Sequence, residues 1–197
     1  MNYQQEFKDL LLSTKREECD YLIEQLEEQG FFKAPASTKF HLNYEGGLVE
    51  HSVNVCKVAL KVREAMIAMD ESLRELLPVD SVIIAALLHD VCKADIYKPA
   101  IKKEKRMGIW TEVPGFDIDY TNFPLGHGEK SVIMLLRWGF ELTDDEIMAI
   151  RWHMSAWDLP FQSADIKGNL NKAKDICPLL TLIQSADGLA SSLIERK

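Results

Sequence analysis

The chain has 197 residues, of which 47% are hydrophobic and 27% are charged. This composition is typical of a globular domain with its own core, and it excludes a disordered tail protein, a collagen-like fibre and a membrane-embedded chain. The 31 acidic residues outnumber the 23 basic ones, and the net charge of −8 argues against broad, non-specific binding to duplex nucleic acid.

Six helices are predicted from the spacing of apolar residues, over residues 3–29, 48–69, 80–93, 128–138, 143–152 and 176–195. The third of these is apolar almost throughout, so we expect it to be buried on several sides. Thr143 and Glu146 form a capping-box pattern at the start of the fifth helix. Pro160 and Gly168 predict a loop before the last helix.

The segment 98–126 is rich in proline and glycine, and we interpret it as an insertion or lid within a single domain that spans residues 1–197. Apolar and polar residues alternate weakly over residues 108–113, which are predicted to form one arm of a hairpin. The segment also carries a run of basic residues: Lys98, Lys102, Lys103, Lys105 and Arg106. This run is either a solvated face or a local patch that attracts a nucleotide or single-stranded nucleic acid.

Four aromatic residues follow that basic run: Trp110, Phe116, Tyr120 and Phe123. They either stack on a base or pack the insertion onto the helices, and we favour packing. The remaining tryptophans, Trp138, Trp152 and Trp157, are expected in the core or at its rim.

The cysteines, at positions 19, 56, 92 and 177, form no CxxC pair and no zinc-ribbon spacing. We expect free, mostly buried thiols and a cytoplasmic location, where thiols stay reduced. The first residues show no signal peptide. The longest apolar run, Val82–Leu88, is too short to cross a bilayer, so no membrane association is expected.

Histidine and aspartate residues carry the chemistry of this sequence. His89 and Asp90 form a doublet on a helix that is predicted to be buried, where two polar side chains need compensation. Imidazole nitrogen and carboxylate oxygen suit Zn, Mn, Fe, Co or Ni, and a metal ion compensates both groups. A lone histidine is more often structural, so the argument depends on the ordered series, which is His51, His89, Asp90, His127, His153 and Asp187.

Three segments of this series resemble the HD-domain superfamily of metal-dependent phosphohydrolases. They are Gly46–Ser52 with His51, Ala85–Lys93 with the His89–Asp90 doublet, and Ser185–Asp187. The resemblance extends over about residues 45–190 and implies an all-α helical bundle. Cys92 stands where the family commonly has glycine, and this departure affects no ligand.

The resemblance also implies a ligand set for two divalent ions. One ion takes His51, His89, Asp90 and Asp187, and the second takes His127 and His153 with Asp90 as the bridge. The alternatives are that His127 is only a helix-start residue and that His153 is a cation at a helix C-terminus. The metal is one of Mn, Fe, Ni, Zn or Mg.

Two further residues are implied to bind substrate. Lys93 lies four residues after His89, one helical turn further and so on the same face, and the matching lysine of the family reaches the substrate phosphate. Asp90 and Lys93 are thus the implied catalytic residues. His41 precedes the first ligand in a segment similar to those of bacterial 3′–5′ exoribonuclease-like HD proteins, and it either lines the pocket or is an ordinary loop histidine.

The implied activity is hydrolysis of a phosphomonoester or phosphodiester, of a nucleotide or oligonucleotide, by attack of a metal-bridging hydroxide. The expected partner is therefore a small phosphorylated substrate or single-stranded nucleic acid. Two alternatives stay open. Some HD proteins with the same ligand order are di-iron oxygenases, and a non-catalytic nucleotide-binding regulatory module would keep the fold without turnover.

Overall fold

A computed structural model describes residues 2–155 and 164–196, so the prediction for Trp157 lies outside the described residues. The helical elements are α1 (Tyr3–Ser13), α2 (Cys19–Glu28), η1 (Phe31–Lys33), α3 (Gly47–Met69), α4 (Leu73–Leu76), α5 (Val79–Leu88), α6 (Lys93–Ile96), α7 (His127–Arg137), α8 (Asp144–Trp152), α9 (Ala164–Ile176), α10 (Pro178–Leu189) and the π-helical turn η3 (Ala190–Ile194). Two strands, β1 (Tyr97–Arg106) and β2 (Ile109–Ile118), interrupt the helices after α6.

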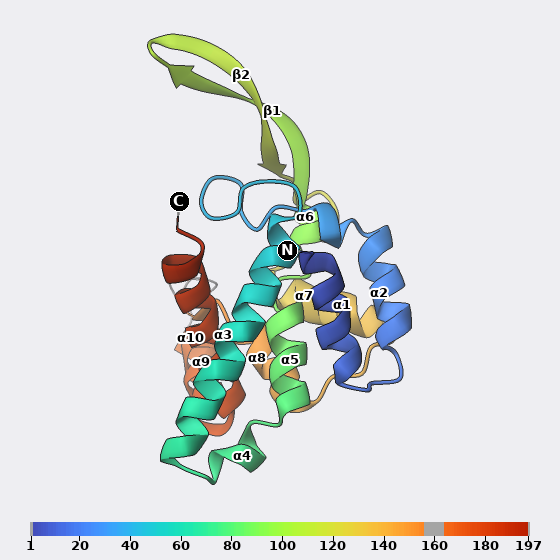
Figure 1. Ribbon diagram of the computed structural model, residues 1–197, viewed down its shortest axis with the longest axis vertical. Coiled ribbons are helices and arrows are strands. Elements are labelled where there is room, and N and C mark those ends of the chain that lie inside the picture. The colour runs from blue at the N-terminus through green and yellow to red at the C-terminus, as the bar shows by residue number, and fades with distance from the viewer. Residues whose placement is uncertain (1, 156–163, 197) are drawn as a thin grey trace.

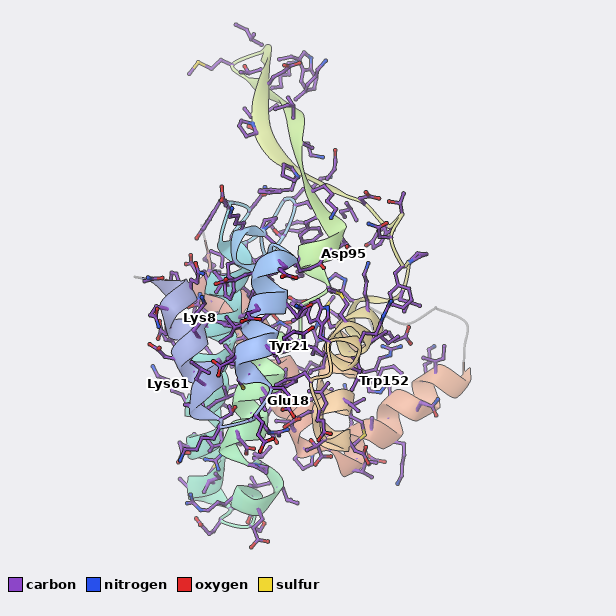
Figure 2. The ribbon with its side chains drawn as sticks, turned by 90° about the vertical axis from the view of Figure 1, so that its right-hand side faces the viewer. Lys8, Glu18, Tyr21, Lys61, Asp95 and Trp152 are labelled. Carbon is purple, nitrogen blue, oxygen red and sulfur yellow. The ribbon has the colours of Figure 1, made fainter. Side chains whose placement is uncertain are left out.

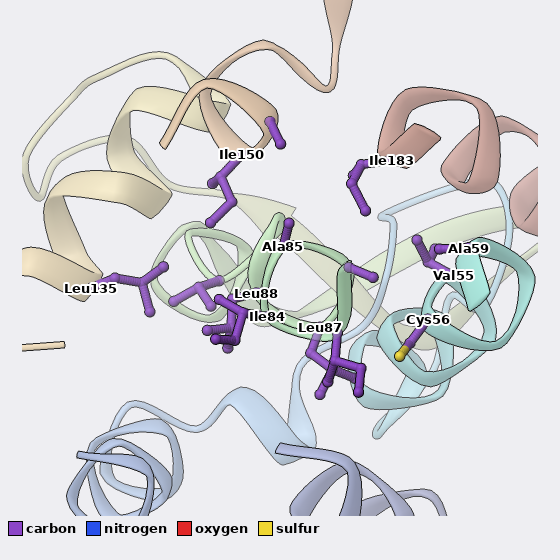
Figure 3. Packing of buried hydrophobic residues seen from close by; sticks show 14 of the residues in the cluster. Val55, Cys56, Ala59, Ile84, Ala85, Leu87, Leu88, Leu135, Ile150 and Ile183 are labelled. Carbon is purple, nitrogen blue, oxygen red and sulfur yellow. The ribbon is translucent and has the colours of Figure 1, made fainter. Parts of the chain in front are cut away.

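The core surrounds α5, which lies between α1, α3, α8 and α10. Every residue of α5 from Ser81 to Leu88 is buried, as its apolar sequence predicts. Figure 3 shows side chains of α5 pointing to different sides of the helix, with labelled residues of four other helices placed around it: Cys56, Leu135, Ile150 and Ile183. The prediction of free, buried cysteines is confirmed for all four.

The prediction of one long helix over residues 3–29 is wrong, because the chain forms two helices there. α1 ends where the Thr14 hydroxyl donates to the carbonyl of Leu11 at 2.6 Å and Lys15 takes a left-handed φ of 59°. Cys19 then opens α2, which packs beside α1 (Figure 1). The turn lets both short helices bury an apolar face on the core.

The third predicted helix is also shorter than expected, because α5 ends at Leu88 and His89 forms its C-cap. The Nδ1 of His89 donates to the carbonyl of Ala86 at 2.8 Å, which satisfies one of the last carbonyls of the helix. Lys93 begins the separate helix α6, so it does not share a helix face with His89.

The predicted loop around Gly168 is wrong as well. The structure places α9 there, with Leu170 and Ala173 buried against the core and no atom near the position that a Gly168 Cβ would take. A glycine on an open helix face costs only about 1 kcal/mol, which burial of an apolar face outweighs. Pro160 lies outside the described residues.

β1 and β2 pair as an antiparallel hairpin that projects from one end of the helical bundle (Figure 1). The all-α expectation is therefore correct only for the bundle, and the hairpin falls almost wholly within the predicted insertion. The backbone N–H of Asp119 donates to the carbonyl of Ile96 at 2.8 Å and ties the base of the hairpin to α6.

The expectation that the aromatic residues of this segment pack onto the bundle is not met by all of them. Trp110 is 67% exposed and Tyr120 is 50% exposed, whereas Phe116 is half-buried near the base of the hairpin. The guanidinium of Arg137 lies 5.4 Å from the ring centroid of Phe123. Trp138 and Trp152 lie partly buried against the core, at the rim position predicted for them.

No single helix among the described residues has the length and apolar character to cross a membrane. One pair, Ile166–Ile176 with Pro178–Ile194, reaches that length only across a bend of 101°.

Candidate metal centre

Helix ends bring the histidines together at the end of the bundle that carries the hairpin. α3 begins and α5 ends at this end (Figure 1). His51 lies in the first turns of α3, His89 directly follows α5, and His127 opens α7. His153 follows the last residue of α8, and Asp187 lies in α10. The six residues predicted as ligands thus come from five helices and meet at one place.

Glycine at position 128 allows α7 and α8 to approach closely. A Cβ at Gly128 would lie 2.2 Å from the carbonyl oxygen of Arg151 and 2.6 Å from that of Ile150. The Nδ1 of His153 donates to the same Ile150 carbonyl at 2.7 Å. Gly128 therefore sets the distance between His127, its neighbour in sequence, and His153.

The carboxylate of Asp90 lies at the centre, and each of its oxygens faces a different pair of histidines. Its Oδ2 lies 3.2 Å from the Nε2 of His89 and 3.6 Å from the Nε2 of His51. Its Oδ1 lies 3.5 Å from the Nε2 of both His127 and His153. The site is thus divided into two halves that share one carboxylate.

Asp187 completes the first half. Its Oδ1 lies 3.3 Å from the Nε2 of His51, and the Nε2 atoms of His51 and His89 are 3.3 Å apart. A four-coordinate ion with ligands at about 2.0–2.2 Å places neighbouring ligand atoms ~3.3 Å apart. The spacing of these donor atoms therefore fits a divalent cation in the middle of the group.

The tautomers of the histidines also fit a cation. The Nδ1 atoms of His89 and His153 bond backbone carbonyls, so they carry the ring protons and their Nε2 lone pairs point inward. Among the described residues, no hydrogen-bond partner reaches the buried Nε2 of His153 or the buried Oδ1 of Asp90. Buried acceptors without donors are costly, and a metal ion satisfies both atoms.

The charges of the site favour ligand forms that bind metal. Burial by itself raises the pKa of Asp90, but Lys93 and the nearby histidines hold that pKa well below its usual range, so the carboxylate is ionised. Burial lowers the pKa of His127 to about 4, which keeps its imidazole neutral. An ionised carboxylate and a neutral imidazole are the ligating forms of both groups.

His51 differs, because it lies between two carboxylates. Burial lowers its pKa, but hydrogen bonds to Asp187 and Glu195 raise it to about 9. A metal ion at this half of the site has to displace the proton that His51 shares with Asp187.

Lys93 and His41 border the cluster. The Nζ of Lys93 lies 2.5 Å from the Oδ2 of Asp90, and the lysine is buried. The rings of His41 and His51 have centroids 5.0 Å apart, and no residue that the structure describes hydrogen-bonds to the buried Nε2 of His41. Both predicted substrate-binding residues therefore lie beside the predicted ligands, although Lys93 reaches the site from α6.

Glu195 is a functional residue that the sequence did not reveal. Both of its carboxylate oxygens lie 3.0 Å from the Nδ1 of His51, and its Oε1 accepts from the Nδ2 of Asn54 at 3.1 Å. Glu195 is 5% exposed and lies eight residues after Asp187, just beyond η3. A carboxylate that accepts the second ring N–H of a ligand histidine fixes its tautomer and increases its basicity.

Comparison with known proteins agrees with this site. The family model of the HD domain matches residues 48–192, so the chain belongs to the HD domain family. The family that the sequence motifs indicated is thereby confirmed, and its matched range includes all six predicted ligands.

A similar curated protein is the dihydroneopterin 2′,3′-cyclic phosphate phosphodiesterase of Methanocaldococcus jannaschii. It is 38% identical to this chain over 88 residues, which are 45% of this chain and 32% of that protein. The matched part thus spans about a third of the length of that relative. No solved structure matches the chain at a significant level.

Proposed function

We propose that the protein is a metal-dependent phosphohydrolase that cleaves a phosphodiester or phosphomonoester of a nucleotide or oligonucleotide. One observation carries this proposal: the two oxygens of Asp90 face two separate histidine pairs, which is the arrangement that a binuclear site needs. Membership of the HD domain family and the likeness to a named cyclic-phosphate phosphodiesterase support it.

In this proposal His51, His89, Asp90 and Asp187 hold one divalent ion, and His127 and His153 hold a second that shares Asp90. Two such ions, when bound, lower the pKa of a water molecule and neutralise the charge that develops on a transferring phosphoryl group. Burial of the ligands increases this electrostatic effect, because the surrounding dielectric constant is low.

Lys93 is proposed to bind a phosphate oxygen of the substrate. Its ammonium group already lies at the central carboxylate, and burial does not neutralise it, because Asp90 raises its pKa above the usual value. A fixed positive charge beside the reacting phosphoryl group stabilises the transition state more than the ground state.

His41 is proposed to hydrogen-bond the substrate at the edge of the site. The backbone around it is held by neighbouring groups, since the Ser37 hydroxyl donates to the carbonyl of His41 at 2.8 Å. A Cβ at Gly47 would lie 2.0 Å from the carbonyl oxygen of Leu42, so the loop that carries His41 packs directly on the start of α3. This packing holds the imidazole beside His51.

The first experiment measures metal content by inductively coupled plasma mass spectrometry for the wild type and for the His127→Ala/His153→Ala variant. We expect about two ions per chain in the wild type and about one in the variant. One ion in both proteins would refute the binuclear assignment, and none in the wild type would refute the metal-dependent function.

The second experiment measures turnover with Mn²⁺ and with Zn²⁺. Bis(p-nitrophenyl) phosphate reports diester cleavage, p-nitrophenyl phosphate reports monoester cleavage, and a 2′,3′-cyclic mononucleotide tests the substrate type named for the relative. Hydrolysis that disappears in Asp90→Asn supports the proposal. Iron content together with oxygen consumption would instead favour the oxygenase alternative.

A further inference from the structure

A cleft lies between the base of the hairpin and the loop that precedes α3. Its volume is about 830 Å³, which is within the range of ligand-binding pockets. It is lined by residues of that loop and of both strands, which are Lys33, Asn43, Tyr44, Glu45, Pro99, Ala100, Ile101, Pro114, Gly115 and Phe116.

None of the residues that line the cleft is a predicted ligand, but each of its two walls belongs to an element that leads to a residue bordering the candidate metal centre. The loop that forms one wall also carries His41, whose ring packs near that of His51. The hairpin that forms the other wall follows α6 directly, and Lys93 of α6 contacts Asp90. The two elements that form the cleft are thus the same two that place His41 and Lys93 beside the predicted ligands.

The strand pairing shows that the hairpin face at the cleft continues toward the tip of the hairpin. Pro99 pairs with Phe116 and Ile101 pairs with Pro114, and these four side chains share a face because alternate residues of a strand point to the same side. Further along the same face, Lys103 is opposite Glu112, and Lys105 is opposite Trp110.

Trp110 and both of these lysines are exposed. The face thus runs from apolar and aromatic residues at the cleft, past the Lys103–Glu112 pair, to an exposed tryptophan opposite Lys105 near the tip. From Phe116 to Trp110 it is six residues long, or about 20 Å, which is longer than a mononucleotide.

The charge of the hairpin is opposite to that of the chain as a whole. β1 contains five of the 23 basic residues and one acidic residue, and β2 adds two acidic residues, so the two strands together carry a charge of +2 in a chain of net charge −8. The hairpin also extends away from the acidic bundle, with its side chains pointing into solvent (Figure 2). A polyanion is therefore attracted to this element although the rest of the surface repels it.

We propose that this face of the hairpin, together with the cleft at its base, binds a single-stranded nucleic acid and directs one of its phosphodiesters to the metal centre. Aromatic side chains on which bases stack, interleaved with cations that contact phosphates, are the features by which proteins bind single strands. This inference rests on the proposed function, since it names the substrate class of the same site.

The test is fluorescence anisotropy of a fluorescein-labelled 12-nucleotide oligothymidylate with the full-length chain, with the length of the oligonucleotide checked on a gel afterwards. Unlabelled oligothymidylate and thymidine monophosphate are used as competitors. We expect the 12-mer to compete at least tenfold more strongly than the monophosphate. Equal competition would overturn the inference, because a small ligand needs only the cleft.

Trp110→Ala is expected to weaken binding about tenfold or more, the usual effect of losing one stacking platform. The matched control is Ile109→Ala, because Ile109 is equally exposed, at 71%, but lies on the opposite face of the hairpin. Equal affinities of the two variants would overturn the assignment of this face.

The double variant Lys103→Ala/Lys105→Ala is expected to lower the slope of log affinity against log salt by ~1.4, or ~0.7 for each phosphate that is no longer neutralised. Its control, Lys61→Ala/Lys172→Ala, removes the same charge from the bundle, where Lys61 lies far from the hairpin (Figure 2). The same slope in both double variants would overturn the proposed pairing of these lysines with phosphates.

Hydrolysis of bis(p-nitrophenyl) phosphate separates this inference from the proposed function. A wild type that hydrolyses the small diester but binds the oligonucleotide without dependence on Trp110 refutes the inference alone. Length-dependent binding that requires Trp110, without any metal-dependent hydrolysis, supports the hairpin surface and refutes the proposed function.

Discussion

Replacement of Glu195 should weaken metal binding although Glu195 is not one of the predicted ligands. Its carboxylate accepts the Nδ1–H of His51 with both oxygens at 3.0 Å, so the proton that leaves when a metal binds is the one on Nε2, which faces Asp90 and Asp187. Removal of such a partner typically costs 10- to 100-fold in metal affinity. Glu195 is thus a positioning residue for the first half of the site.

Two substitutions of Glu195 separate its charge from its hydrogen bond. In Glu195→Gln the amide oxygen, at the place of Oε1, can still accept from His51 and Asn54, while the amide nitrogen replaces the second acceptor. The negative charge and one acceptor are removed, and we expect about tenfold weaker binding. Glu195→Ala also leaves two buried donors unpaired, at about 1–3 kcal/mol each, and we expect a reduction nearer to 100-fold.

The assay is competition for Zn²⁺ or Mn²⁺ against a chromophoric chelator, with circular dichroism to show that each variant is folded. Glu75→Gln serves as a matched control, because it removes one charge from an exposed position on α4. Wild-type metal affinity in the folded Ala variant would refute the reasoning, since His51 would then be oriented without its carboxylate.

Three further predictions concern the contact between α7 and α8, a buried ion pair and the removal of metal. Gly128→Ala should reduce bound metal from about two ions to about one, because its Cβ would clash with the carbonyl of Arg151 and move α7 away from α8; an unchanged metal content would contradict this. Glu146→Ala should lower the free energy of unfolding by about 3–5 kcal/mol in urea denaturation, because Glu146 is fully buried and accepts a hydrogen bond from Arg16 at 2.6 Å. A decrease under about 1 kcal/mol would contradict this prediction. Chelation of the metal should lower the melting temperature of the wild type, because a bound ion stabilises the native state. The melting temperature of Asp90→Asn should stay unchanged, because this variant is expected to bind no ion. Equal shifts in both proteins would contradict this.

The sequence by itself determined the family, the helical character and the group of residues that converge. The doublet His89–Asp90 is informative because two adjacent polar side chains at the end of a fully apolar helix require compensation, whatever the exact fold. The order of the histidines along the chain then suffices to predict which residues belong to one site.

Helix breaks were not evident in the sequence. The apolar spacing over residues 3–29 continues through Lys15, whose left-handed backbone ends α1 only because both helices can then pack on the core. The same applies to Lys93, which contacts Asp90 from α6 and not from a continuation of α5. Local periodicity carries no information about such turns, because tertiary packing decides them.

The resemblance to the HD-domain superfamily implied the two halves of the site, but only the tertiary structure revealed the position of Glu195 beside His51. In a regular α-helix Glu195 would point ~80° away from Asp187, since each residue turns the helix by about 100°. The backbone N–H of Glu195 instead donates to the carbonyl of Ala190 at 3.0 Å, an i to i+5 bond that widens the turn and brings both carboxylates to His51. The spacing of residues does not indicate a one-residue change in helix winding. The sequence could therefore specify the predicted ligands but not the group that orients them.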